Sequence, residues 1–204
     1  MALSMDPVNT RPRLLIEEWL PIAEIGIEGV RERTPMTPFP APNRLHVWWA
    51  RRPLVASRAA VLASLLPADA DRSTFLHMLG IHGDSLAAKV RIAQATRDGL
   101  RLGKEAYGYS RAFSYSASPE ERDWFRSVRS AVIGDNDPCV LDPTAGGGSI
   151  PFEAARLGLR TIANDLNPVA WLILKATVEF PAKYGQELLS RYEKLVLCHS
   201  LILG

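Results

Sequence analysis

The sequence lacks several features that would place it in a well-marked class of protein. Its two cysteines, Cys139 and Cys198, form no C-x-x-C pair, so the chain encodes no zinc ribbon or redox pair and fits a reducing cytoplasm. No apolar run approaches the length of a membrane helix, and residues 1–10 lack the basic start and apolar stretch of a signal peptide. We therefore expect a cytoplasmic protein with no membrane partner and no metal site.

The chain also lacks a strong charge bias. Its net charge of +2 over 204 residues is too small to indicate nucleic-acid binding by itself. A hydrophobic content of 47% and a charged content of 23% are ordinary for a globular protein. The length fits one domain, or one domain with an appendage. The function must therefore be argued from motifs.

Proline divides the N-terminal part of the chain. Residues 14–20 predict a short helix that the following proline stops. Residues 31–44 contain closely spaced prolines, which favour extended backbone and exclude a helix. A helix is expected over residues 53–67, because proline suits its first turn and another proline closes it. Residues 68–137 have the composition of a mostly helical insert.

The pattern changes after residue 138. Residues 139–142 predict a short buried strand, residues 150–158 a helix and residues 159–165 a second strand. Helices over 167–180, with Asn167 as N-cap, and over 183–201 follow. Strand, helix and strand at this spacing indicate a parallel unit. The expected fold is α/β, a partial Rossmann-like sheet preceded by a mostly helical N-terminal region.

A glycine-rich loop, T-A-G-G-G-S at residues 144–149, separates the first strand from its helix. Such a loop leaves backbone N–H groups open to a ligand. A nucleoside triphosphate site needs a G-K pair that this loop lacks. A dinucleotide site needs G-x-G-x-x-G; Gly146 and Gly148 supply two glycines, but Pro151 occupies the third position, which weakens this interpretation without excluding it.

S-adenosylmethionine fits the loop better, since it carries no pyrophosphate. Asp142 ends the first strand, where it is placed to accept from the methionine ammonium, and glycines let the backbone approach the ligand. Asp165 ends the next strand and suits the ribose hydroxyls, as the acidic residue of dinucleotide folds does. Two alternatives stay open: the loop is only a tight turn, and Asp165 is a helix-capping or solvated residue.

Residues 142–158 and 163–170 resemble motif I and the following acidic loop of amino-group methyltransferases, whose motif I reads D-P-x-x-G-x-G. Upstream, residues 16–33 and 43–67, the latter with H-V-W-W-A-R-R-P-L, resemble the N-terminal conserved domain of adenine-specific DNA methylases. The resemblance extends over nearly the whole chain from about Arg13. It implies an S-adenosylmethionine-dependent DNA adenine (N6) methyltransferase, with DNA as the partner of the full-length protein.

The resemblance implies a set of cofactor-binding residues: Asp142, Pro143, Thr144, Ala145, Gly146, Gly148, Asp165, Leu166 and Asn167, and, through a segment similar to motif X, His46, Trp49, Arg52 and Pro53. Arg52 would meet the cofactor carboxylate. Trp48 and Trp49 would line the pocket or stack on a base. Alternatively, both tryptophans anchor the proline-rich arm and His46 is structural.

One part of the family pattern is missing. The catalytic motif of base amino-methylation, an Asp, Asn or Ser followed by P-P and an aromatic residue, occurs nowhere in the chain. We therefore expect no catalytic residue here and a truncated protein that is inactive alone. Its unpaired sheet edge would favour self-association. The expected segments are a disordered or vector-derived tail (1–12), the N-terminal conserved segment (13–67), the insert (68–137) and the cofactor-binding start of the methyltransferase domain (138–204).

Two other functions remain. RNA guanine-amino methyltransferases carry a similar glycine motif followed by E-A, which Glu153 and Ala154 match. The segment H-V-W-W-A-R-R-P-L argues against such a fragment. A non-catalytic nucleotide-binding module that keeps the glycine loop is the other alternative.

Overall fold

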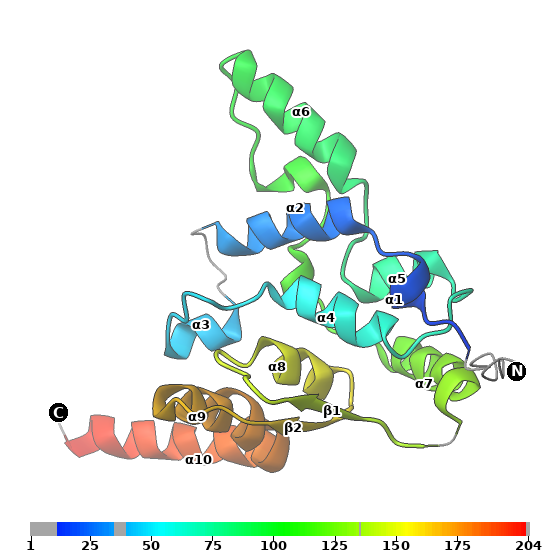
Figure 1. Ribbon diagram of the computed structural model, residues 1–204. Helices are drawn as coiled ribbons and strands as arrows, with labels where there is room; N and C mark the ends of the chain where they lie inside the picture. The colour runs from blue at the N-terminus through cyan, green and yellow to red at the C-terminus, as the bar shows by residue number, and fades with distance from the viewer. Residues whose placement is uncertain (1–11, 35–39, 135, 203–204) are drawn as a thin grey trace, which may run out of the picture.

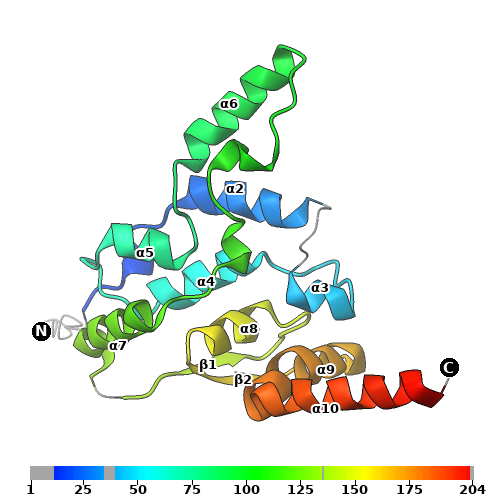
Figure 2. The same ribbon diagram turned by 180° about the vertical axis from the view of Figure 1, so that it is seen from behind.

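The computed structural model describes residues 12–34, 40–134 and 136–202 (Figure 1). In Figures 1 and 2, α8 (Ser149–Arg156) lies between the strands of a small sheet and the helices from the N-terminal half, α9 (Pro168–Leu174) lies beside the strands, and α10 (Phe180–Ile202) lies below them. Nearly all of the expected N-terminal tail and the middle of the proline-rich stretch lie outside the described residues.

The N-terminal segment forms α1 (Leu15–Glu18), α2 (Ile22–Arg33), α3 (Ala41–Leu45) and α4 (Leu54–Ala63). The short helix before Pro21 and the helix after Pro53 are confirmed. The expectation of extended backbone over 31–44 is wrong at both ends. The last turn of α2 extends to Arg33, where basic side chains favour a helix C-terminus, and Pro42 is tolerated in α3 because it sits in the first turn.

The middle of the chain is largely helical. It contains α5 (Arg72–Met78), α6 (Ser85–Arg97) and α7 (Pro119–Ile133), with the short 3-10 turns Lys104–Tyr107 and Ala112–Ser114 between α6 and α7. Asp84 caps α6 by accepting from a backbone N–H, and a capping box starts α7. Helix α6 projects away from the other elements (Figures 1 and 2).

The strand–helix–strand prediction is confirmed. Strands β1 (Cys139–Asp142) and β2 (Arg160–Ala163) pair in parallel, joined by α8 (Ser149–Arg156). The prediction of a buried strand over 139–142 is wrong for part of β1: Leu141 and its register partner Ile162 are both exposed. Alternate side chains of a strand point to opposite faces, and among the described residues only the α8 face is covered. The described residues thus show a two-stranded parallel sheet in a mostly helical chain.

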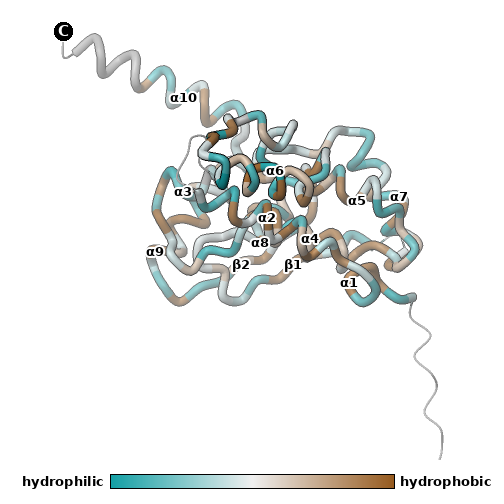
Figure 3. The backbone as a smooth tube through the Cα atoms, turned by 90° about the horizontal axis from the view of Figure 1, so that it is seen from above, coloured by the Kyte–Doolittle hydropathy of each residue, from teal (hydrophilic) through white to brown (hydrophobic). Residues whose placement is uncertain are grey.

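The second strand leads into a long helical segment. It consists of α9 (Pro168–Leu174), a π-helical turn (Lys175–Glu179) and α10 (Phe180–Ile202), whose backbone is non-helical at Gly185, with φ +47° and ψ −130°. The sequence predicted two helices, over 167–180 and 183–201, and the break between helical stretches lies at Gly185. Asn167 is the N-cap of α9, as predicted: its Oδ1 accepts from the backbone N–H of Val169 at 2.9 Å. Figure 3 shows α10 directed away from the rest of the chain. Residues 179–195 are all exposed.

None of the described helices is both long enough and apolar enough to cross a membrane. Self-association through the unpaired edge of the sheet stays a prediction.

One hydrophobic core connects the segments. Helices α4 and α8 pack directly against each other, although they are far apart in the sequence. The core contains buried side chains from α1, α4, α5, α7 and α8, among them Leu15, Leu62, Phe75, Phe125 and Ala154. The N-terminal helices, the insert and the glycine-loop unit are therefore built around shared apolar side chains.

A buried ion-pair network lies at the contact between α4 and α8. The Glu153 side chain is fully buried, and its Oε2 accepts from Nε of Arg58 at 2.6 Å. Its other oxygen accepts from Arg156 at 2.8 Å. Arg58 also donates to the carbonyls of Met78, Leu79, Ala112 and Tyr115. Two guanidinium groups therefore hold one carboxylate and several loop carbonyls together.

We predict that Glu153→Ala destabilises the protein by about 3–5 kcal/mol, because it leaves the buried Arg58 guanidinium without its counter-ion. Urea unfolding followed by circular dichroism measures this change. The matched control is Glu187→Ala, which breaks the exposed Arg191–Glu187 pair on α10 and should leave the midpoint nearly unchanged. Equal effects of the two substitutions would contradict the network's structural importance.

Candidate functional site

The glycine loop joins β1 to α8 and is fixed to the end of β2. The Ala145 N–H donates to the Asn164 carbonyl, and the Asn164 N–H donates to the Asp142 carbonyl, each at 2.9 Å. Gly146 and Gly148 have φ values of +50° and +76°, a left-handed conformation that favours glycine. The loop conformation therefore depends on Gly146 and Gly148, the two glycines that match the G-x-G-x-x-G pattern of dinucleotide sites.

Asp165 connects the two strand ends. Its Oδ2 accepts from the Gly146 N–H at 2.7 Å and its Oδ1 accepts from the Asn167 N–H at 2.8 Å. The N–H groups of Asn167 and Gly146 lower the pKa of this carboxyl, so it is ionised at neutral pH. A carboxylate offers about four acceptor positions, so the backbone N–H groups leave part of its acceptor capacity for a ligand.

Trp48 lies against the bare backbone of the loop. A Cβ atom on Gly146 would lie 2.9 Å from Trp48 Nε1, and one on Gly147 would lie 3.0 Å from Trp48 Cβ. A Cβ atom on Gly148 would lie 3.0 Å from a methyl carbon of Leu174. The three glycines thus accommodate protein side chains in this structure, with Trp48 over the first two.

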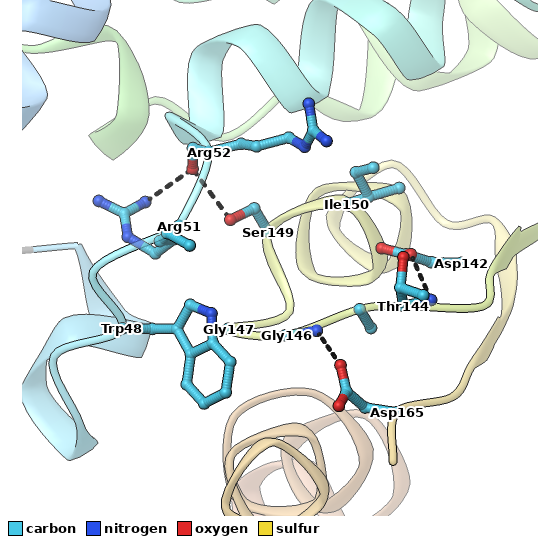
Figure 4. Close-up of a pocket in the computed structure, with 12 residues that line it drawn as sticks. Trp48, Arg51, Arg52, Asp142, Thr144, Gly146, Gly147, Ser149, Ile150 and Asp165 are labelled. Atoms are coloured by element: carbon cyan, nitrogen blue, oxygen red, sulfur yellow. Dashed lines mark hydrogen bonds between the residues drawn. The ribbon is translucent and has the colours of Figure 1, made fainter. Parts of the chain in front are cut away.

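A pocket of about 310 Å³ lies where the turn before α4 meets the loop (Figure 4). Its lining comes from the two regions, namely Trp48, Ala50, Arg51 and Arg52 from the first, and Asp142, Thr144, Ala145, Gly146, Gly147, Ser149, Ile150 and Asp165 from the second. Figure 4 shows Arg52 and Asp165 on opposite sides of the pocket. The N-terminal segment therefore forms one wall of a pocket whose other wall is the glycine loop.

Several residues expected to bind a cofactor do line this pocket: Asp142, Thr144, Ala145, Gly146, Asp165 and Arg52. Asp142 is buried, and its Oδ1 accepts from the Thr144 N–H at 3.3 Å. Arg52 is exposed, and its guanidinium forms no ion pair with any residue that the structure describes. The pocket thus brings together two carboxylates and one free cation.

The other expected residues lie outside the pocket lining: Pro143, Gly148, Leu166, Asn167, His46, Trp49 and Pro53. Leu166 and Trp49 are 98% and 92% exposed, and His46 is exposed at the end of α3. Asn167 uses its side chain to cap α9. Pro53 lies against Gly29 of α2, where a Cβ would approach its Cγ to 3.3 Å.

Trp48, one of the two tryptophans expected to line the pocket or to stack on a base, is in the lining. The structure adds residues that the sequence did not single out: Ala50, Arg51, Gly147, Ser149 and Ile150. Of the two adjacent tryptophans, Trp48 rather than Trp49 faces the loop. The Ser149 hydroxyl donates to the Arg52 carbonyl at 2.9 Å and so joins the two walls. The pair W-W in the sequence indicates an aromatic contact, but only the turn geometry decides which ring makes it.

The geometry defines a class of site: a parallel α/β unit with a glycine loop and an acidic residue at the end of each strand. Residues 19–79 match the family model described as "Protein of unknown function (DUF1156)". The matched range contains Trp48 and Arg52 but ends before the glycine loop, and its description names no enzyme. No curated protein and no solved structure matches the chain.

We predict that Gly147→Ala destabilises the protein by about 1–3 kcal/mol, because the new methyl group would press on Trp48. Gly147 does not have a positive φ, so backbone strain does not contribute. The same substitution should cost less in a Trp48→Ala background, because alanine removes the ring atoms at 3.1 and 3.4 Å but keeps the Cβ at 3.0 Å. A double-mutant cycle by urea unfolding measures the coupling.

Gly103→Ala is the matched control, since a Cβ there meets nothing within 4 Å. Additive effects of Gly147→Ala and Trp48→Ala would show that the ring does not lie against the loop.

Proposed function

We propose that this chain is the N-terminal, cofactor-binding part of an S-adenosylmethionine-dependent DNA adenine (N6) methyltransferase that works in the cytoplasm. The observation that carries the proposal is the pocket, in which Asp142 and Asp165, from the ends of adjacent parallel strands, face a glycine loop and a free Arg52. In this proposal the β1–β2 pair is the start of a Rossmann-like sheet.

The pocket groups match the charges of the cofactor. The acceptor capacity left on Asp165 suits ribose hydroxyls, which donate hydrogen bonds. Asp142 suits the methionine ammonium, and the Arg52 guanidinium suits the methionine carboxylate. At about 310 Å³ the volume is at the lower end for ligand pockets, which fits part of the cofactor being held here.

Methyl transfer itself is not assigned to any residue of this chain. The aromatic catalytic motif of base amino-methyltransferases is absent from the sequence. In this proposal DNA binds through the full-length protein, and the present residues hold the methyl donor.

An RNA guanine-amino methyltransferase stays an alternative, with less support from the pocket than the DNA enzyme. It depends on the E-A match at Glu153, but this carboxylate is buried between Arg58 and Arg156 and does not line the pocket. The ion pairs with Arg58 and Arg156 give Glu153 a structural role that needs no substrate. The non-catalytic nucleotide-binding module uses the same pocket, and ligand selectivity distinguishes it from the methyltransferase.

We predict that Arg52→Ala weakens S-adenosylmethionine binding about tenfold or more, because the carboxylate loses its cation. The same variant should bind 5′-methylthioadenosine, which lacks the amino-acid end, as well as the unchanged protein does. Titration calorimetry with both ligands measures the difference. Arg52 is exposed, so the substitution leaves the core intact.

Arg44→Ala, in an exposed position on α3, is the matched control and should bind both ligands normally. An unchanged affinity of Arg52→Ala for S-adenosylmethionine would contradict the assigned role. Binding of ATP or NAD without binding of S-adenosylmethionine would favour the nucleotide-binding module instead.

A further inference from the structure

The turn that carries Trp48 is attached to both neighbouring helices. The Arg51 N–H donates to the Trp48 carbonyl at 3.0 Å and closes the turn. The Arg51 carbonyl accepts from the Arg33 guanidinium at 3.3 Å, and the Arg52 carbonyl accepts from Ser149. The position of Trp48 over the loop therefore depends on what holds Arg51.

A carboxylate on α2 holds Arg51, which itself lines the pocket. Glu32 is 3% exposed and its Oε1 accepts from Arg51 Nη1 at 2.5 Å. Its Oε2 accepts from the Leu54 N–H at 2.8 Å and thereby satisfies the first turn of α4. Arg51 is itself buried, with 8% of its surface exposed. One oxygen of Glu32 thus binds the turn, through Arg51, and the other binds the start of α4, through Leu54.

Burial raises the pKa of the Glu32 carboxyl, and the Arg51 guanidinium opposes that rise. The two groups are accordingly dependent on each other, because each would be a buried charge without a partner if the other were removed. The Glu32–Arg51 pair therefore favours the one conformation of the Trp48 turn in which both charges are paired.

We propose that Glu32 is a positioning residue for the pocket, acting through Arg51 to hold Trp48 against the glycine loop. Glu32 does not line the pocket, so it touches no ligand there. Its effect on ligand affinity rests on the proposed function, whereas its effect on Trp48 does not. All three residues fall within the range of the family match, so this arrangement is built from the matched segment alone.

The experiment is ¹⁹F NMR of protein labelled with 5-fluorotryptophan. The chain has five tryptophans, and Trp48→Phe assigns the resonance of interest. We expect Glu32→Gln to move the ¹⁹F chemical shift of Trp48 toward that of a solvent-exposed 5-fluorotryptophan. The H₂O/D₂O isotope shift of the same resonance should rise. The resonances of Trp19, Trp124 and Trp171 should stay in place, which shows that the variant is folded.

Two further variants sharpen the test. Arg51→Gln should reproduce the effect while leaving the Glu32 contact to Leu54 available, and it replaces Glu32→Gln if that variant unfolds. Glu24→Gln, on the same helix, is the matched control and should leave the Trp48 resonance unchanged. In titrations, Glu32→Gln should weaken S-adenosylmethionine binding about tenfold if only a tenth of the molecules retain the ordered turn.

An unchanged Trp48 resonance in folded Glu32→Gln and Arg51→Gln overturns the proposal. The two proposals fail separately. If the unchanged protein does not bind S-adenosylmethionine, the proposed function is wrong, but a shift of Trp48 in the ligand-free variants still supports the positioning role.

Discussion

The packing of α4 against α8 depends on one buried carboxylate, Glu153, held between Arg58 and Arg156. Charges taken out of water must be paired with good geometry, so this contact permits only a narrow range of positions for α4 relative to α8. Arg58 and Glu153 are 95 residues apart in sequence, and their pairing at 2.6 Å joins two distant parts of the chain. Because α4 follows directly after the Trp48 turn, fixing α4 also fixes one wall of the pocket.

This network has a consequence for how the chain is divided. The family match ends at residue 79, so it includes Arg58 but not the residues that Arg58 contacts further along the chain. These are Ala112, Tyr115 and Glu153. The matched segment supplies Trp48 and Arg52 to the pocket, and the glycine loop supplies Asp142 and Asp165. The matched segment and the loop unit therefore act structurally as one body, and the pocket exists only when both are present.

Local features were predictable from the sequence. The strand–helix–strand unit, the Asn167 cap and the helix after Pro53 follow from residue types at close spacing, and all are present. The placement of Asp142, Asp165 and Arg52 at a pocket could also be expected from motif positions. Long-range contacts were not predictable: nothing in the residues around Glu153 indicates Arg58, and the choice between Trp48 and Trp49 depends on a turn that Glu32 holds from another helix. The glycines show the same limit, since their lack of a Cβ indicates a close approach without identifying Trp48 as the group that approaches.

The central claim is that two distant segments form a single pocket for S-adenosylmethionine. Hydrogen exchange measured by mass spectrometry, with and without this ligand, tests it most directly, because slowed exchange reports ordered or protected amides. The account predicts that the ligand slows exchange at residues 48–52 and at residues 144–149 and 165–167 together. Slowing that is confined to one of these segments, that falls elsewhere, or that is absent at saturating ligand would contradict it.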